Sequence, residues 1–158
     1  LLKISSPMEL SSIEVTNNLS KKISGILKLG DTIFLYGEIG SGKTTFTRFL
    51  IHNLEHKNKS KKSDVLSPTF NIVYDYSIGN KKILHYDLYR LKNNRDILEL
   101  GIFENLKKNI RIIEWPELIK LKPKDRIEIF FKYLKNDSSR KVKILGFGKW
   151  KEFKFNEI

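Results

Sequence analysis

The fold is decided by one short stretch of this sequence, Gly37-Glu38-Ile39-Gly40-Ser41-Gly42-Lys43-Thr44-Thr45. Two glycines five positions apart, followed by a lysine and a threonine, match the spacing of the P-loop, a phosphate-binding turn. An apolar run from Thr32 to Tyr36 leads into the stretch, and a helix predicted from Lys43 to about Leu54 leads out of it. Glycines let backbone N–H groups approach phosphate oxygens, and the helix N-terminus adds its dipole there. The pattern and its context therefore predict a phosphate site between a strand and a helix.

The residue types inside the stretch indicate a nucleotide ligand. We expect all nine residues to line the nucleotide site, with Lys43 placing its charge on the β- and γ-phosphates and the Thr44 hydroxyl ligating Mg²⁺. The Asn-Lys-x-Asp signature of Ras-type GTPases is absent, because neither Asn58-Lys59 nor Asn80-Lys81 has an aspartate two residues later. ATP and ADP are therefore favoured over guanine nucleotides.

Two acids are candidates for the metal and for the attacking water, which a P-loop enzyme must hold and orient. Glu114 ends the apolar run 110–113, and Asp87 ends the run 83–86. Two other interpretations remain open: Glu114 as a solvated carboxylate at a strand end, and Asp87 as the cap of a turn. His85 is a candidate catalytic base, although a histidine packed in a strand is the favoured interpretation.

Composition excludes several classes of protein. The 158 residues contain 30 Lys and Arg against 18 Asp and Glu, a net charge of +12, but 24 of the 30 cations are Lys. Because the chain has no Ala or Gln and is rich in Ile and Asn, we attribute most of this charge to A/T-rich codons rather than to a nucleic-acid site. The absence of Cys excludes disulfides, zinc–thiolate sites and thiol nucleophiles. No apolar run approaches ~18 residues, so we expect a cytoplasmic protein without a membrane span.

The remaining patterns predict alternating helices and strands in a single domain over residues 1–158. A helix is expected from about Ser12 to Lys28, starting at a capping box of Ser11 and Glu14. The Lys-rich segment 56–63 is expected to be an exposed loop. Strands are expected at 70–76, 82–87 and 110–115, a partly helical segment at 96–108, and a hairpin at 126–134 and 140–147.

Several segments together resemble one family. They are the P-loop stretch, SPTF at 67–70, HYDLYRL at 85–91, Glu-Leu-Gly at 99–101, and IEWPE at 113–117. Their order and spacing are similar to the TsaE (formerly YjeE) family, the P-loop ATPases of bacterial threonylcarbamoyladenosine tRNA modification. The resemblance runs from about Ser11 to Phe147 and leaves the tail 149–158 outside.

The resemblance implies an α/β, P-loop NTPase-like three-layer sandwich, with a parallel sheet flanked by antiparallel strands. It also implies a Mg²⁺-dependent ATPase that is weak alone and stimulated by the TsaB–TsaD heterodimer. TsaD would transfer the threonylcarbamoyl group, so this chain would meet tRNA indirectly, through the complex. Alone, it would be a monomer.

By the same resemblance, Lys43 and Thr44 bind phosphate and Mg²⁺, and Glu114 and Asp87 form the acidic side of the metal and water site. Thr69 in SPTF resembles a switch residue that senses the γ-phosphate.

The resemblance suggests less definite roles for three further residues. Trp115 and Arg90 lie in family motifs and would position the nucleotide or face the partner, and Arg140 is a candidate contact to the base.

Two other functions remain open from the residues alone. One is a non-catalytic tRNA-binding module that uses the lysines of segment 57–62. The other is a small-molecule kinase, which would need an Arg-bearing lid and an acceptor pocket, and the sequence identifies neither.

Overall fold

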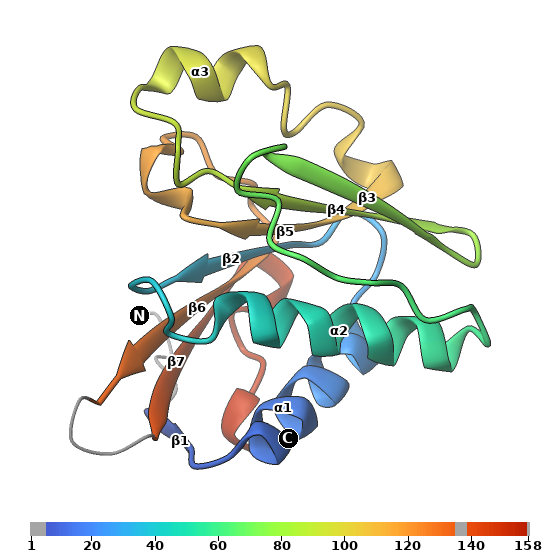
Figure 1. Cartoon of the computed structure of the whole chain (residues 1–158), viewed down its shortest axis with the longest axis vertical. Helices are drawn as coiled ribbons and strands as arrows, with labels where there is room; N and C mark the ends of the chain where they lie inside the picture. The colour runs from blue at the N-terminus through green and yellow to red at the C-terminus, as the bar shows by residue number, and fades with distance from the viewer. Residues whose placement is uncertain (1–5, 135–138, 158) are drawn as a thin grey trace.

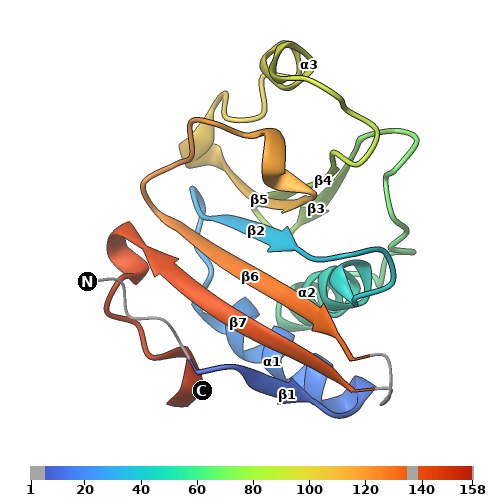
Figure 2. The same cartoon turned by 90° about the vertical axis from the view of Figure 1, so that its left-hand side faces the viewer.

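Seven strands form one mixed sheet in the computed structural model, which describes residues 6–134 and 139–157. Their order across the sheet is β1-β7-β6-β2-β5-β4-β3 (Figure 2). In chain order they are β1 (Met8–Leu10), β2 (Thr32–Tyr36), β3 (Val73–Ile78), β4 (Lys81–Asp87), β5 (Asn109–Glu114), β6 (Arg126–Tyr133) and β7 (Arg140–Phe147).

The four central strands are parallel to one another. β2 pairs in parallel with β5 and β6, and β4 pairs in parallel with β5. Antiparallel strands flank them, β7 and β1 beyond β6, and β3 beyond β4. This arrangement confirms the predicted parallel sheet with antiparallel flanks.

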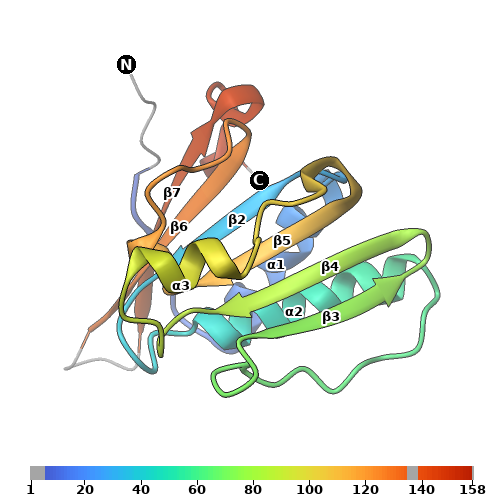
Figure 3. The ribbon, with the colours of Figure 1, turned by 90° about the horizontal axis from the view of Figure 1, so that it is seen from above.

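Helices cover both faces of the sheet. The helices α1 (Ile13–Ile26) and α2 (Lys43–Lys57) pack side by side on one face (Figure 1). The short helix α3 (Asn94–Glu99) lies on the other face, as the view from above shows (Figure 3). Four 3₁₀ turns complete the structure, at Leu106–Lys108, Pro116–Leu118, Gly148–Trp150 and Phe155–Glu157. The predicted three-layer α/β sandwich is therefore confirmed.

Alternation along the strands divides the core into two parts, because successive side chains point to opposite faces. Ile33 and Leu35 belong to the cluster beneath α1 and α2, whereas Phe34 between them belongs to the cluster beneath α3. Ile112 and Ile113 of β5 divide in the same way. The central strands are thus buried on both faces, as parallel strands require.

One buried arginine shapes the α3 face. Arg111 of β5 is fully buried, and its guanidinium donates to the carbonyl oxygens of Ile102, Glu104 and Leu106 at 2.5, 2.5 and 3.0 Å. Burial lowers the pKa of Arg111 from its ordinary value. Because a guanidinium offers five donors in a rigid fork, one side chain can satisfy this irregular segment after α3.

The structure corrects several expected boundaries. The N-cap of α1 is Ser12, not Ser11, because the Ser12 hydroxyl accepts from the backbone N–H of Val15 at 3.3 Å. α2 runs three residues further than expected, and β3 begins at Val73 rather than at residue 70. Within segment 96–108, α3 ends at Glu99 and only the 3₁₀ turn at 106–108 follows. The hairpin of β6 and β7 is confirmed, although residues 135–138 of its turn lie outside the described residues.

Across residues 6–134 and 139–157, none of the helices has the length and apolar character needed to cross a membrane.

The segment after β7 packs into the main core. Trp150 and Phe155 are 8 % and 3 % exposed and join the cluster beneath α1 and α2. Lys149 of the same segment forms an ion pair with the buried Asp31 at 2.6 Å. The tail that falls outside the family resemblance is therefore part of the folded structure.

This packing predicts the stability of two neighbouring variants. Phe155→Ala removes a buried ring and leaves a cavity, so it should lower the free energy of unfolding by about 3 kcal/mol. Lys154→Ala loses only a surface ion pair with Glu157, so it should change stability by less than about 0.5 kcal/mol. Urea unfolding at unchanged m-value measures both. Equal midpoints for the two variants would show that the tail does not contribute to the core.

Candidate functional site

The loop between β2 and α2 needs glycine at its first position. Gly37 has a φ of 147°, and a Cβ there would lie 2.5 Å from the Ser41 hydroxyl and 2.8 Å from the carbonyl oxygen of Phe131. Gly42, the last residue before α2, has a φ of 109°. Both values lie where glycine is favoured, and the contacts at Gly37 exclude any side chain. The turn predicted from the glycine spacing is therefore present.

The N-terminus of α2 is left open, unlike that of the other two α-helices. α1 and α3 are capped by Ser12 and Asn93, and each has an acid in its first turn. α2 has Gly42 at its N-cap, no acid in its first turn, and no side-chain cap among the described residues. Its first N–H groups lack intrahelical partners and carry the positive end of the helix dipole. This helix end is suited to an anion.

Lys43 stands at the same end of α2 and is turned back onto the loop. Its ammonium donates to the carbonyl oxygens of Gly37 at 2.5 Å and Glu38 at 2.9 Å, and lies 4.0 Å from the ring centroid of Trp115. Burial lowers the pKa of Lys43, while the nearby carboxylates, Glu114 foremost, oppose this shift. The Lys43 ammonium therefore lies beside the N-terminus of α2, and its hydrogen-bond acceptors there are neutral carbonyl oxygens.

Glu114 is buried, with 2 % exposure, and contacts two side chains from other elements. The Thr44 hydroxyl lies 3.1 Å from both of its carboxylate oxygens. His85 Nε2 of β4 lies 2.8 Å from Oε1. Glu114 is therefore not a solvated strand-end carboxylate, and His85 is packed in its strand, as favoured, but packed against this acid.

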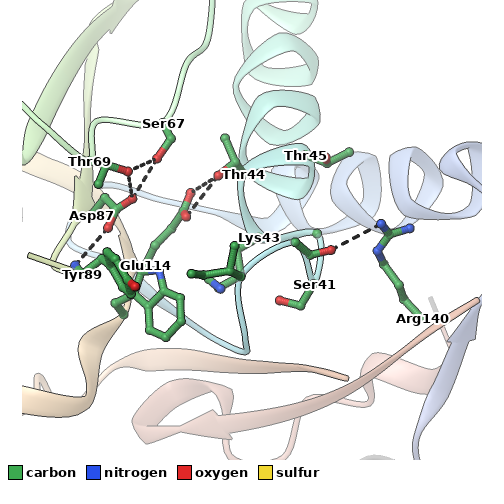
Figure 4. A pocket seen from close by; sticks show the side chains of 14 residues that line it. Ser41, Lys43, Thr44, Thr45, Ser67, Thr69, Asp87, Tyr89, Glu114 and Arg140 are labelled. Carbon is green, nitrogen blue, oxygen red and sulfur yellow. Dashed lines mark hydrogen bonds between the residues drawn. The ribbon is translucent and has the colours of Figure 1, made fainter. Parts of the chain in front are cut away.

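Asp87 lies beside Glu114, because the two are direct partners in the β4–β5 register. Its Oδ2 accepts from the hydroxyls of Ser67 and Thr69, each at 2.7 Å, and its Oδ1 accepts from the backbone N–H of Tyr89 at 3.0 Å. Figure 4 shows both acids and their hydroxyl partners facing one pocket. Oδ1 of Asp87 therefore caps a turn, as one interpretation of the sequence proposed, and Oδ2 faces the pocket.

These groups line a pocket of about 430 Å³. It contains most of the residues predicted from the sequence, including Ile39, Gly40, Ser41, Gly42, Lys43, Thr44, Thr45, Thr69, Asp87 and Glu114. Gly37 and Glu38 do not line it, because they lie behind Lys43 and hold its ammonium.

The sequence suggests roles at this site for three further residues, Trp115, Arg140 and Arg90. Trp115 and Arg140 line the pocket, and the Arg140 guanidinium lies 3.4 Å from the carbonyl oxygen of Gly40. Arg90 does not line it; its guanidinium donates to the Phe70 carbonyl at 3.0 Å on the exposed surface. Sequence reasoning gave no role to Ser67 or Tyr89, although both lie inside the quoted motifs SPTF and HYDLYRL.

The donor set fits a metal that retains water and phosphate ligands. Within the described part of the chain, no cluster of three His, Asp or Glu side chains could hold a metal by itself. Mg²⁺ does not require one, because it is usually bound through one or two carboxylates together with substrate phosphates and water. Thr44, Glu114 and Asp87 could supply that smaller set.

Comparison with known proteins agrees with this geometry. Residues 10–142 match the family model described as threonylcarbamoyl adenosine biosynthesis protein TsaE. The proteins of that name from Rickettsia conorii and Rickettsia typhi are 44 % and 40 % identical over 70 % and 81 % of this chain. The matches span 61 % of the Rickettsia conorii protein and 87 % of the Rickettsia typhi protein.

More distant bacteria give the same result. The Bacillus subtilis protein of that name is 30 % identical over 92 % of this chain and 88 % of its own length. The crystal structure of Bacillus subtilis YdiB superimposes with a TM-score of 0.77 at 26 % identity, covering 99 % of this chain and 94 % of that one. This chain therefore belongs to the TsaE family of tRNA threonylcarbamoyladenosine biosynthesis proteins.

Proposed function

We propose that this protein is an ATP-binding and ATP-hydrolysing subunit that supports threonylcarbamoyladenosine modification of tRNA in the cytoplasm. One observation carries the proposal. The uncapped N-terminus of α2, with Lys43 in its first turn, faces two carboxylates at the ends of neighbouring parallel strands. Phosphoryl transfer from a nucleoside triphosphate requires a cation, oriented N–H groups and paired acids.

Binding of the triphosphate would begin with Lys43. Its ammonium leaves the carbonyl oxygens of Gly37 and Glu38 and donates to the β- and γ-phosphates, which are stronger acceptors because they are charged. The N–H groups of the first turn of α2 donate to the same phosphates. Arg140, beside Gly40, is placed to contact the part of the nucleotide that extends past the loop.

Thr44 and one of the two acids, Glu114 or Asp87, would hold Mg²⁺ directly, and the metal would supply charge neutralisation for the β- and γ-phosphate oxygens. In this proposal the Thr44 hydroxyl turns from Glu114 towards the metal position. The other carboxylate would accept a hydrogen bond from the attacking water and so direct the oxygen of that water at the γ-phosphate. Thr69, which donates to Asp87, would sense that phosphate.

We infer that the TsaB–TsaD heterodimer raises a weak intrinsic activity. Several parts of the site are held by partners that must be released before turnover, Lys43 by loop carbonyls and Asp87 by Ser67 and Thr69. A partner that stabilises the released arrangement would accelerate hydrolysis without adding chemistry of its own. In this role the chain drives rounds of modification, and TsaD transfers the threonylcarbamoyl group.

Hydrolysis in the presence of TsaB–TsaD should depend on Thr44 and Glu114. Thr44→Ala and Glu114→Gln should each lower partner-stimulated kcat by about 100-fold or more, because each removes a ligand or orienting group from the transition state. Phosphate release measures the rate, and circular dichroism verifies the fold. Glu157→Gln is the matched control, since it neutralises an exposed carboxylate of the C-terminal tail outside the pocket and should retain the wild-type rate. Wild-type turnover in Glu114→Gln would remove that residue from the mechanism.

The Lys-rich segment provides a test against the tRNA-binding alternative. Lys57 is the last residue of α2, so the expected loop 56–63 begins inside the helix, and Lys59, Lys61 and Lys62 follow it. The helix has 15 residues and is therefore about 22 Å long. At the end of the Lys-rich segment, the backbone N–H of Ser63 donates to the buried carboxylate of Glu55 at 3.0 Å, and this bond holds the segment against α2.

Changing these four lysines to Gln should therefore alter partner-stimulated hydrolysis by less than about twofold, because they lie a helix length from Lys43. If the segment instead binds tRNA phosphates, the loss should be large and should fade as salt rises. Hydrolysis rates at two salt concentrations separate the two outcomes.

A further inference from the structure

His85 lies in the core behind the pocket, and the proposed function gives it no task. Its side chain is fully buried in β4, where its Cα pairs with Ile112 of β5. Glu114 is two residues further along β5, on the same face of the sheet. Diagonal neighbours of this kind are within reach when the side chains are long, and His85 Nε2 lies 2.8 Å from Glu114 Oε1.

The contact has a defined direction. With Glu114 as a carboxylate, which only accepts hydrogen bonds, Nε2 carries the hydrogen and donates the hydrogen bond to Oε1. Nδ1 has no hydrogen-bond partner among the described residues. A neutral imidazole has one N–H, so a hydrogen on Nε2 leaves Nδ1 as the unprotonated nitrogen. Both ring nitrogens are therefore consistent with the Nε2–H form.

Thr44 and His85 bind Glu114 in different ways. The Thr44 hydroxyl spans both carboxylate oxygens at 3.1 Å, whereas His85 contacts Oε1 alone. When Thr44 turns towards Mg²⁺, His85 is the remaining side-chain donor to Glu114 seen in the described structure. Asp87 differs, because its side-chain donors Ser67 and Thr69 come from a segment at the pocket rim.

We propose that His85 is a positioning residue, which holds Glu114 Oε1 through Nε2–H so that Oε2 stays directed at the metal and water position after Thr44 has left. This inference rests on the proposed ATPase function. His85 itself touches neither nucleotide nor metal. Residues that orient a carboxylate at a metal site typically contribute 10- to 100-fold to affinity or activity, and we expect His85 to do the same.

Two substitutions separate hydrogen bonding from packing. His85→Leu removes the donor and keeps an apolar side chain, whereas His85→Gln places an amide N–H near the position of Nε2. We expect His85→Leu to lower kcat, or to raise the apparent Mg²⁺ constant, by about 10- to 100-fold, and His85→Gln to recover most of that loss. Binding of ADP in EDTA should change by less than about twofold in both, because it depends on Lys43 and α2. Equal losses in Leu and Gln variants would overturn the proposal.

His52→Leu is the matched control. His52 also has Nε2 bonded, to the carbonyl oxygen of Ser63 at 2.9 Å, but it lies on α2 away from both acids. Its removal should leave hydrolysis within about twofold of wild type.

A double-mutant cycle tests whether His85 acts through Glu114. In a Glu114→Gln background, His85→Leu should cause no further loss beyond about twofold, because the carboxylate it orients is already gone. A further loss as large as in the wild-type background would show that His85 supports the fold or another group.

A spectroscopic measurement tests the contact without hydrolysis. Long-range ¹H–¹⁵N correlation spectra of the nucleotide-free protein should show the proton of His85 on Nε2, and an Nδ1–H tautomer would overturn the inference. Absence of TsaB–TsaD-stimulated hydrolysis in the wild-type protein would instead refute the proposed function, and the tautomer would still test the contact with Glu114.

Discussion

The parallel register of three strands is the constraint on which the site depends. β5 pairs with β2 on one side and β4 on the other, so Leu35, Glu114 and Asp87 lie level across the sheet. Because parallel strands end at the same edge, the loop after β2 and the two acids emerge together there. A slip of one residue between β4 and β5 would turn one carboxylate to the opposite face. If β5 slipped, Arg111 would also lose its carbonyl acceptors on the α3 face and enter the core beneath α1 and α2, which opposes the slip.

The two acids are supported by parts of the molecule that differ in burial. Glu114 is held by His85, which is fully buried inside the sheet. Asp87 is held by Ser67 and Thr69, from a rim segment with Ser67 exposed. Exposed segments with few buried contacts open at lower free-energy cost than core strands. One carboxylate is therefore fixed by the core, whereas the position of the other is linked to the SPTF segment.

Sequence reasoning succeeded where the signal is local. The P-loop turn and the candidate site residues Lys43, Thr44, Asp87 and Glu114 follow from short patterns at the ends of predicted strands, and the α/β sandwich followed from the resemblance to the TsaE family. It failed where the contact depends on tertiary register. The pairing of His85 with Glu114 is diagonal across two strands, and no spacing in the sequence encodes it. The short strand β1 and the core packing of Phe155 were likewise missed, because three extended residues and a Lys-rich tail carry no periodic pattern.

One of the two tryptophans lies in the pocket, and the other lies in the core. Trp115 lies over the Lys43 ammonium in the pocket, while Trp150 is packed under the helices with Phe153. Intrinsic fluorescence therefore has two separate sources. Emission from Trp115 responds to movement of the cation beneath it, and emission from Trp150 responds to loosening of the core. A Trp150→Phe protein would carry a single reporter at the pocket, so that ligand entry and unfolding could be followed as distinct optical signals without an added dye.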